Sequence, residues 1–203
     1  MKTCYTREQI ESTVKSKGYK WFENGDYNVN IVGVRNSDTG TRITNRFDDC
    51  LTISYKEDGE WKFHCFECTT DPGDDWMDKP MNSKGCAILV PGQYRGSHKL
   101  RLHQGRYLAL GQQKNVKVYR DRDQDGEYDF DESTIDEGLF GINIHRATKY
   151  AGKTSTYVDK WSAGCQVIAS NDDWHTFLDI CQTARDKWSN NFTYTLIESK
   201  DIA

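Results

Sequence analysis

Residues 51–68, LTISYKEDGEWKFHCFEC, decide the fold class of this chain. Apolar and polar residues alternate on both sides of the centre, which is the period of a strand with one buried face. Asp58-Gly59 lies at the centre, and this dipeptide favours the left-handed backbone of tight hairpin turns. The stretch therefore predicts two antiparallel strands joined by a short turn.

Further strand-like segments lie on both sides of this hairpin. Turn residues separate them, among them Pro91-Gly92 and Gln104-Gly105. Many short strands with turns between them are typical of a β-sandwich or a β-barrel. The other expected strands lie at residues 29–34, 86–90, 99–110, 116–119, 140–145 and 192–197.

Two helices are expected, one near each end of the chain. Thr6 can cap the first with Gln9 as its return partner, and Gly18 can end it near residue 17. Ser170 can cap the second, with Asp173 three positions later. One face of this second helix is apolar and is expected in the core; it carries Trp174, Phe177, Leu178, Cys181 and Trp188.

We therefore expect one domain, residues 1–203, that is mainly β with flanking helices (α+β). An N-terminal helical segment occupies residues 1–22, and a β-rich body occupies residues 27–203. Within that body, residues 121–132 form a loop inserted between strands.

The composition indicates a folded protein without a broad nucleic-acid surface. Lys and Arg number 27 against 31 Asp and Glu, a net charge of −4, whereas nucleic-acid surfaces carry an excess of basic residues. Hydrophobic residues make up 36% and aromatic residues 12% of the chain, enough to fill a core. No apolar run reaches the about 18 residues of a membrane span, and the N-terminus lacks the apolar stretch of a signal peptide. We expect cytoplasmic synthesis, a monomer, and thiols instead of disulfides among the seven cysteines.

Residues 121–132, DRDQDGEYDFDE, show the pattern of a calcium loop. Acidic side chains occupy loop positions 1, 3, 5, 9 and 12, and Gly126 at position 6 permits a sharp turn. Without a cation these carboxylates would repel one another; the alternative is an ordinary solvated acidic loop. The expected ligands of Ca²⁺ are the carboxylates of Asp121, Asp123, Asp125, Asp129 and Glu132 and the backbone carbonyl of Glu127.

The segments that flank the acidic loop alternate as strands and not as helices. The loop is therefore not expected to be half of a helix–loop–helix calcium sensor. We expect it to connect the strand over residues 116–119 to a strand over residues 140–145, which ends at His145. A bound calcium ion would then hold the strand that carries His145.

His145 and Cys165 are candidates for a catalytic pair. On the strand that ends at His145, alternation places the imidazole on the more polar face. Cys165 follows Ser162-Ala163-Gly164, a small-residue turn whose backbone N–H groups could form an oxyanion hole. A thiol with an ordinary pKa near 8.5 is mostly protonated at neutral pH and needs an adjacent imidazole to attack. The alternative is a buried thiol and an unrelated imidazole.

Two motifs resemble the signature of the L,D-transpeptidase catalytic domain: INIHR over residues 142–146 and SAGCQV over residues 162–167. TTDPG over residues 69–73 is similar to that family's TP-x-G element. The resemblance implies a β-sandwich-like fold and attack on peptidoglycan stem peptides at the bond between the third residue and D-alanine. It assigns Cys165 as the nucleophile, His145 as the base, Gly164 with Cys165 as the oxyanion-hole region, and Ser162 as a turn and hydrogen-bonding residue.

The chain departs from that family's pattern at several positions. Ala163 stands where the motif has His, Val167 where the family usually has Arg, and Arg146 where it more often has Gly. Without the downstream Arg, the usual contact with a substrate carboxylate is missing. We expect Arg146, Ala163 and Gln166 to contribute to substrate binding. With the acidic loop, these departures resemble a divergent, phage- or prophage-type member.

The resemblance implies a cysteine-dependent acyl-transfer enzyme that forms a thioester with the stem peptide. Water then resolves it in a carboxypeptidase or endopeptidase, and an amine resolves it in a transpeptidase; a phage-type hydrolase favours water. Such a protein would act at the cell wall after release by other lysis proteins. The alternatives are a calcium-stabilised, non-catalytic binding or virion structural protein, and a cysteine peptidase of a different substrate class.

Other motifs carry less weight. Cys65 and Cys68 have a CxxC spacing, but no second pair completes a zinc site, and positions i and i+3 of a strand face opposite sides. His98 and His103 flank a strand-like segment, and we expect structural or surface histidines there, although His103 could line the same cleft as His145.

Overall fold

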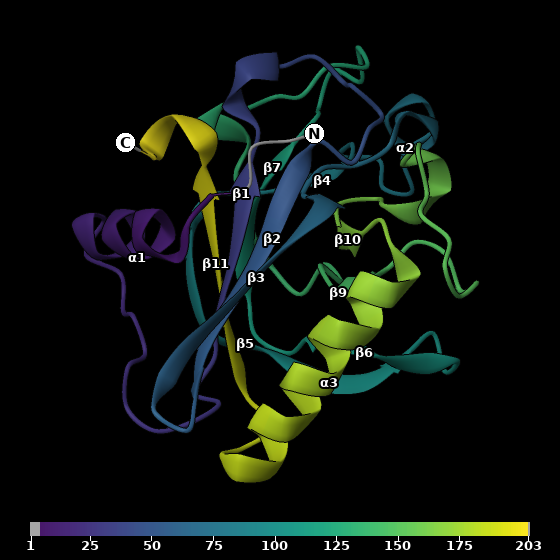
Figure 1. Cartoon of the computed structure of the whole chain (residues 1–203). Coiled ribbons are helices and arrows are strands. Elements are labelled where there is room, and N and C mark those ends of the chain that lie inside the picture. Colours follow the sequence, from purple (N-terminus) through teal and green to yellow (C-terminus); the bar gives the residue numbers. More distant parts are fainter. Residues whose placement is uncertain (1–4, 203) are drawn as a thin grey trace.

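The computed structural model describes residues 5–202 as a mainly β protein with helices near both ends. The barrel strands are β1 (Asn30–Arg35), β2 (Asp49–Glu57), β3 (Glu60–Thr69), β5 (Gly92–His103), β6 (Tyr107–Gln112), β9 (Ile144–Arg146), β10 (Gln166–Ile168) and β11 (Phe192–Glu198). A smaller sheet contains β4 (Ala87–Leu89), β7 (Val116–Arg120) and β8 (Asp136–Gly138). The α-helices are α1 (Arg7–Ser16), α2 (Asp74–Asp78) and α3 (Asn171–Lys187) (Figure 1). In this part of the chain, no helix combines the length and apolar character that crossing a membrane requires.

β2 and β3 form the hairpin that the sequence predicts. Their pairing runs without a break from the turn to Asp49, which lies opposite Cys68. Asp58 and Gly59 both have positive φ, 51° and 79°, as a two-residue turn of the I′ type requires. The turn residues therefore fix the register of the longest pair of strands.

The sheet closes on itself, so the finer expectation of a β-sandwich does not describe it. The barrel order is β1-β11-β5-β6-β9-β10-β3-β2, and β2 pairs again with β1. Two parallel pairings, β1 with β11 and β9 with β10, join segments that are distant in the sequence. A closed sheet has no free edge strands, whereas two stacked open sheets would have them. Sandwiches and barrels both contain alternating strands, so periodicity could not distinguish them.

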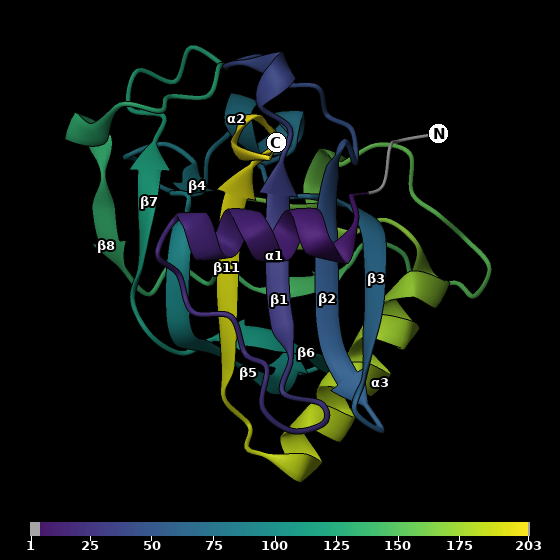
Figure 2. The same cartoon turned by 60° about the vertical axis from the view of Figure 1, so that its left-hand side comes forward.

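α1 covers the outer face of the barrel over β1, β2 and β11 (Figure 2). Thr6 caps it as predicted, because its side chain accepts from the N–H of Gln9 and the Gln9 side chain accepts from the N–H of Thr6. Gly18, with φ of +73°, lies just past the helix end. Ile10 and Val14 are buried against the strands below. Local signals were therefore sufficient to place this helix.

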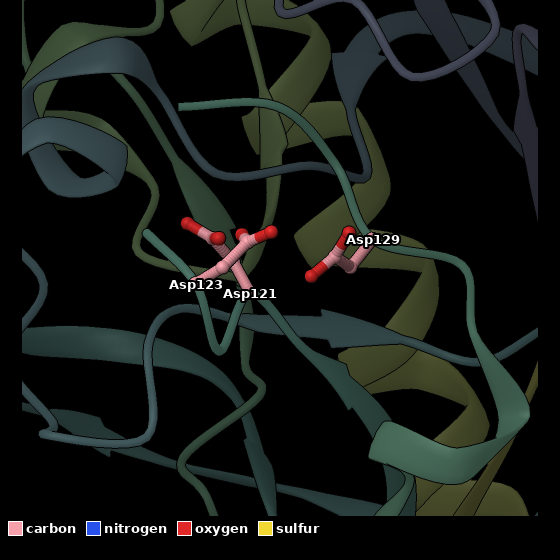
Figure 3. A group of neighbouring side chains, drawn as sticks. All are labelled: Asp121, Asp123 and Asp129. Atoms are coloured by element: carbon pink, nitrogen blue, oxygen red, sulfur yellow. The ribbon is translucent and has the colours of Figure 1, made fainter. Parts of the chain in front are cut away.

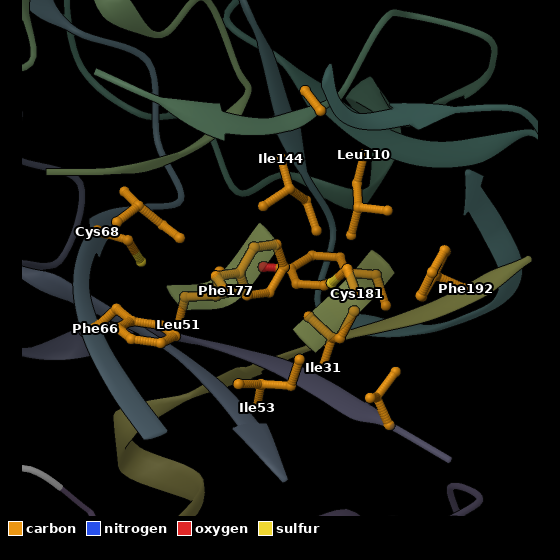
Figure 4. Close-up of a cluster of buried hydrophobic side chains, with 14 of the residues drawn as sticks. Ile31, Leu51, Ile53, Phe66, Cys68, Leu110, Ile144, Phe177, Cys181 and Phe192 are labelled. Atoms are coloured by element: carbon orange, nitrogen blue, oxygen red, sulfur yellow. The ribbon is translucent and has the colours of Figure 1, made fainter. Parts of the chain in front are cut away.

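α3 lies against the barrel and completes its hydrophobic core (Figure 4). Trp174, Phe177 and Cys181 are buried among side chains of the barrel strands, as the apolar face predicts. Trp188 differs from the prediction, because 54% of it is exposed. It follows the last helical residue, and its indole N–H donates to the carbonyl of Asp26 at 2.9 Å.

The segment before His145 also differs from the prediction. β9 includes His145, but residues 140–143 precede it without strand structure, and Gly141 has a φ of +77° that breaks the alternation. The acidic loop joins β7 to β8, which pairs back onto β7. The expectation that the loop leads into the strand of His145 is wrong, because β8 and β9 belong to different sheets.

Candidate functional site

The parallel pairing of β9 and β10 brings the two candidate residues together. Val167 lies opposite His145 in the register, so Cys165, just before β10, comes beside Asn143. Cys165, Asn143 and His145 all line one pocket of about 530 Å³. Residues that are distant in the sequence thus face a common space.

A tight turn holds Cys165 at this pocket. The hydroxyl of Ser162 donates to the carbonyl of Cys165 at 2.8 Å and accepts from the N–H of Gly164 at 3.1 Å. Gly164 has a φ of +120°, and a Cβ there would lie 2.2 Å from the carbonyl oxygen of Ala87, so this position requires glycine. From the TTDPG segment, the N–H of Gly73 donates to the carbonyl of Ser162 at 2.9 Å. Neighbouring backbone therefore constrains the turn on two sides.

The thiol of Cys165 is protonated in this arrangement. Its sulfur donates to the carbonyl of Gly141 at 3.3 Å. Burial raises the pKa of the thiol to about 11, and the backbone N–H of Asn143 offsets this only in part. Among the hydrogen bonds of residues 5–202, none joins this sulfur to His145. The two side chains share a pocket as a neutral thiol and imidazole, and not as an ion pair.

The backbone orients the imidazole of His145. Its Nδ1 lies 2.8 Å from the carbonyl oxygen of Arg146, and since a carbonyl only accepts, Nδ1 carries the proton. Nε2 then has the lone pair that a general base needs. Burial, together with neighbouring His103, lowers the pKa of His145 to about 4 against the opposing effect of the Arg146 carbonyl. At neutral pH the imidazole is uncharged and can accept a proton.

His103 lines this pocket, although the sequence favours a structural or surface role for it. Its ring stacks on that of His145 with centroids 4.5 Å apart, and its Nδ1 lies 3.5 Å from the side-chain amide of Asn143. The expectation of a structural histidine holds for His98, which is buried and whose Nε2 donates to the carbonyl of Ile142 at 2.9 Å. His98 and His103 are five residues apart on β5, so strand alternation places them on opposite faces, but it does not show which face borders the pocket.

The expected substrate-binding residues occupy different environments. Ala163 lines the pocket. The guanidinium of Arg146 lies over the ring of Tyr107, 4.4 Å from its centroid. Gln166 faces the barrel interior, fully buried, and accepts from the hydroxyl of Tyr194 at 2.6 Å; as the strand neighbour of Cys165 it points the opposite way. Six other pocket residues are basic or aromatic: Arg101, Arg106, Lys160, Trp76, Tyr107 and Trp161.

Three of the expected calcium ligands converge in the acidic loop (Figure 3). Asp121, Asp123 and Asp129 each place a carboxylate oxygen within 4.8 Å of the others. Asp121 directly follows β7 and is fully buried. Burial and the neighbouring carboxylates raise the pKa of Asp121 to about 6, although the N–H of Gln124 donates to its Oδ1 at 3.0 Å.

The other expected ligands lie outside this group of three. The carboxylate of Asp125 accepts from the N–H of Glu127 at 2.8 Å. The carboxylate of Glu127 accepts from the hydroxyl of Thr41 at 2.9 Å. Glu132 is exposed and begins a 3₁₀ turn, Glu132–Thr134. The structure therefore gathers loop positions 1, 3 and 9, and leaves positions 5 and 12 apart from them.

Comparison with known proteins does not assign the chain to a family. No family model, curated protein or solved structure matches it. The L,D-transpeptidase resemblance thus rests on the motifs around His145 and Cys165.

Proposed function

We propose that this protein is a cysteine-dependent acyl-transfer enzyme that acts on peptidoglycan stem peptides. The observation that carries the proposal is that Cys165 and His145, from separate segments, line the same pocket. The resemblance of their two motifs to L,D-transpeptidases supplies the substrate class. In this proposal the closed barrel is a divergent form of that family's fold.

The chemistry needs one proton carrier and one nucleophile. Nε2 of His145 takes the proton from the sulfur of Cys165 as the sulfur attacks the scissile carbonyl carbon, after leaving its hydrogen bond to Gly141. The imidazolium then gives this proton to the leaving amine, and a thioester remains. Water, activated by the same imidazole, hydrolyses the thioester to a carboxylate and restores the thiol. An amine in place of water would give a cross-link, and we favour hydrolysis.

Ser162 acts in this scheme as a positioning residue. Its hydroxyl already accepts from the N–H of Gly164, the expected oxyanion donor. A developing oxyanion would compete with that hydroxyl for the same N–H. Ser162 therefore holds the turn in the free protein. During the proposed reaction its hydroxyl releases the N–H of Gly164, which then donates to the oxyanion.

The pocket suits a short acidic peptide. Its volume of about 530 Å³ lies within the usual range of small-molecule sites. Stem peptides carry free carboxylates, which Arg101, Arg106 and Lys160 can pair with from exposed positions in the pocket. Because the guanidinium of Arg146 stacks on Tyr107, we assign carboxylate binding to Arg101, Arg106 and Lys160 and not to Arg146.

The test compares wild type with Cys165→Ala on purified muropeptides, with products followed by mass spectrometry. Wild type is expected to shorten or cleave the stem peptide, and Cys165→Ala to show no turnover. His145→Gln should be slower by about 10²- to 10⁴-fold, the usual contribution of a general base. Cys65→Ala, which removes a thiol outside the pocket, is the matched control. Turnover by Cys165→Ala at the wild-type rate would refute the proposal.

A second candidate is a calcium-stabilised, non-catalytic binding or virion structural protein. It is favoured by the protonated thiol of Cys165, whose pKa burial raises to about 11, and by the hydrogen bond of that thiol to a backbone carbonyl. The same assay separates the two candidates, because a binding protein would retain muropeptides without turnover. Cys165→Ala would then bind them as wild type does.

A further inference from the structure

The acidic loop offers chemistry that the proposed acyl transfer does not use. Asp121 has no exposed surface, and its Oδ2 lacks a hydrogen-bond partner among the described residues. Its other oxygen accepts from the N–H of Gln124. Buried carboxylate oxygens are normally paired, so an unpaired one indicates a missing partner.

The surroundings of that oxygen define the missing partner. Asp123 and Asp129 each place a carboxylate oxygen within 4.8 Å of one carboxylate oxygen of Asp121. The oxygens of Asp123 and Asp129 are also within 4.8 Å of each other. None of the salt bridges within residues 5–202 involves these three carboxylates. Three negative groups gathered without a basic side chain attract a small cation.

We propose that Asp121, Asp123 and Asp129 bind a divalent cation of the calcium class. Carboxylate oxygens are hard ligands, and loop positions 1, 3 and 9 are calcium-ligand positions in twelve-residue loops. Water and backbone carbonyls complete the six to eight ligands that Ca²⁺ takes. Mg²⁺ is a weaker fit, because it demands near-ideal octahedral geometry.

The ion lies behind the turn that carries the candidate nucleophile. The N–H of Asp121 donates to the carbonyl of Cys86 at 3.4 Å. Gly85 packs so closely that a Cβ on it would lie 1.5 Å from the carbonyl oxygen of Asp121. Ala87, two residues after Gly85, is the residue whose carbonyl lies against Gly164. A cation at the loop therefore stabilises β7. Through residues 85–87 it also stabilises the packing of Ala87 against the turn that carries Cys165.

The binding test uses the intact chain, Ca²⁺ or Mg²⁺ alone, isothermal titration calorimetry and thermal unfolding. Wild type should bind one Ca²⁺ and gain about 5 to 10 °C in Tm at a hundred-fold excess over Kd. Asp121→Asn should weaken Ca²⁺ binding at least about tenfold, since one charged ligand is lost. Because Asp121 is buried, the double variant Asp123→Asn with Asp129→Asn provides a second test at more exposed positions. Glu137→Gln, an exposed acid on β8, is the matched control and should bind as wild type does.

Several results would overturn the proposal. These are a wild-type protein without saturable Ca²⁺ binding, a double variant with wild-type affinity, or Mg²⁺ binding as tight as that of Ca²⁺. Amide hydrogen exchange addresses the role assigned to the ion. Ca²⁺ should slow exchange at residues 85–89 and 116–120, and unchanged exchange there would refute that role.

Discussion

Cys165 and His145 both lose their charged forms to burial. The pKa of the thiol is raised to about 11 and that of the imidazole is lowered to about 4, so both are neutral near pH 7. In the proposed reaction, the proton must therefore move during attack and not before it. A substrate that fills the pocket and displaces the thiol from Gly141 would bring sulfur and imidazole into contact.

The pH dependence of alkylation tests whether the thiol and the imidazole are both neutral near pH 7. In the free protein, the rate of Cys165 with iodoacetamide should rise about tenfold per pH unit between about pH 7 and pH 10, because only the thiolate reacts. His145→Gln should leave the neutral-pH rate within about threefold of wild type, since the imidazole does not ionise the thiol. Peptide mass spectrometry follows the site, with Cys165→Ala as the background. A plateau below pH 8 that vanishes in His145→Gln would instead reveal a preformed thiolate–imidazolium pair.

Local sequence pointed to the two candidate side chains but not to the groups that contact them. His145 and Cys165 lie in motifs with recognisable spacing. The carbonyls of Arg146 and Gly141, which hold the imidazole and the thiol, are backbone atoms and leave no signal in the sequence. The stacking of His103 on His145 depends on how β5, β6 and β9 are ordered in the barrel. The sequence thus indicates which residue types are present, whereas their contacts can be found only from the fold.

At the scale of elements, the turn before β10 depends on one close approach of two backbones. Gly164→Ala should destabilise the protein by about 3 kcal/mol or more, through a strained φ of +120° and a clash with the carbonyl of Ala87. Tm should fall by about 6 to 12 °C. Gly152→Ala is the control, because Gly152 also has a positive φ, +67°, but its added Cβ would meet nothing within 4 Å.

Denaturant unfolding of the two variants separates strain from packing. Gly152→Ala should lose only about 1 kcal/mol, the cost of a left-handed backbone without glycine. The difference between the variants measures the contact of the turn with β4. Equal losses would contradict the close packing of Gly164 on Ala87.

Elements with strong local signals were predicted, and elements defined by pairing were not. The hairpin of β2 and β3, the cap of α1 and the buried face of α3 follow from turn residues, capping residues and periodicity. β8 was missed because its three residues, Asp136–Gly138, have no apolar alternation and are a strand only by pairing with β7. For the same reason the acidic loop was assigned to the wrong downstream strand.

At the scale of the whole molecule, barrel closure determines what is buried. Closure depends on β1 meeting β11 and on β9 meeting β10, and neither pairing has a local signature. The closed barrel with α3 then buries two histidines, His98 and His145, as neutral side chains. Burial lowers the pKa of each to about 4.

These histidines give the fold a defined acid sensitivity. Below the ordinary pKa of about 6.5 the unfolded chain protonates both, whereas the folded protein does so only near pH 4, so stability should fall as pH drops through that interval. Each histidine contributes at most about 1.4 kcal/mol per pH unit. Raised pKa values at Asp49 and Asp121 act in the opposite direction, so the measurement must compare variants that share these carboxyls.

Urea unfolding between pH 4.5 and pH 7 of wild type, His98→Gln and Ser97→Ala makes that comparison. His98→Gln can keep a donor for the Ile142 carbonyl but removes one titrating group, so its stability should depend on pH with a slope smaller by about one proton. Ser97→Ala removes the hydroxyl beside Nδ1 of His98, 2.8 Å away, and should lower stability while keeping the wild-type slope. If His98→Gln and wild type give parallel slopes, His98 is not held neutral by the barrel, and acid sensitivity must come from other groups.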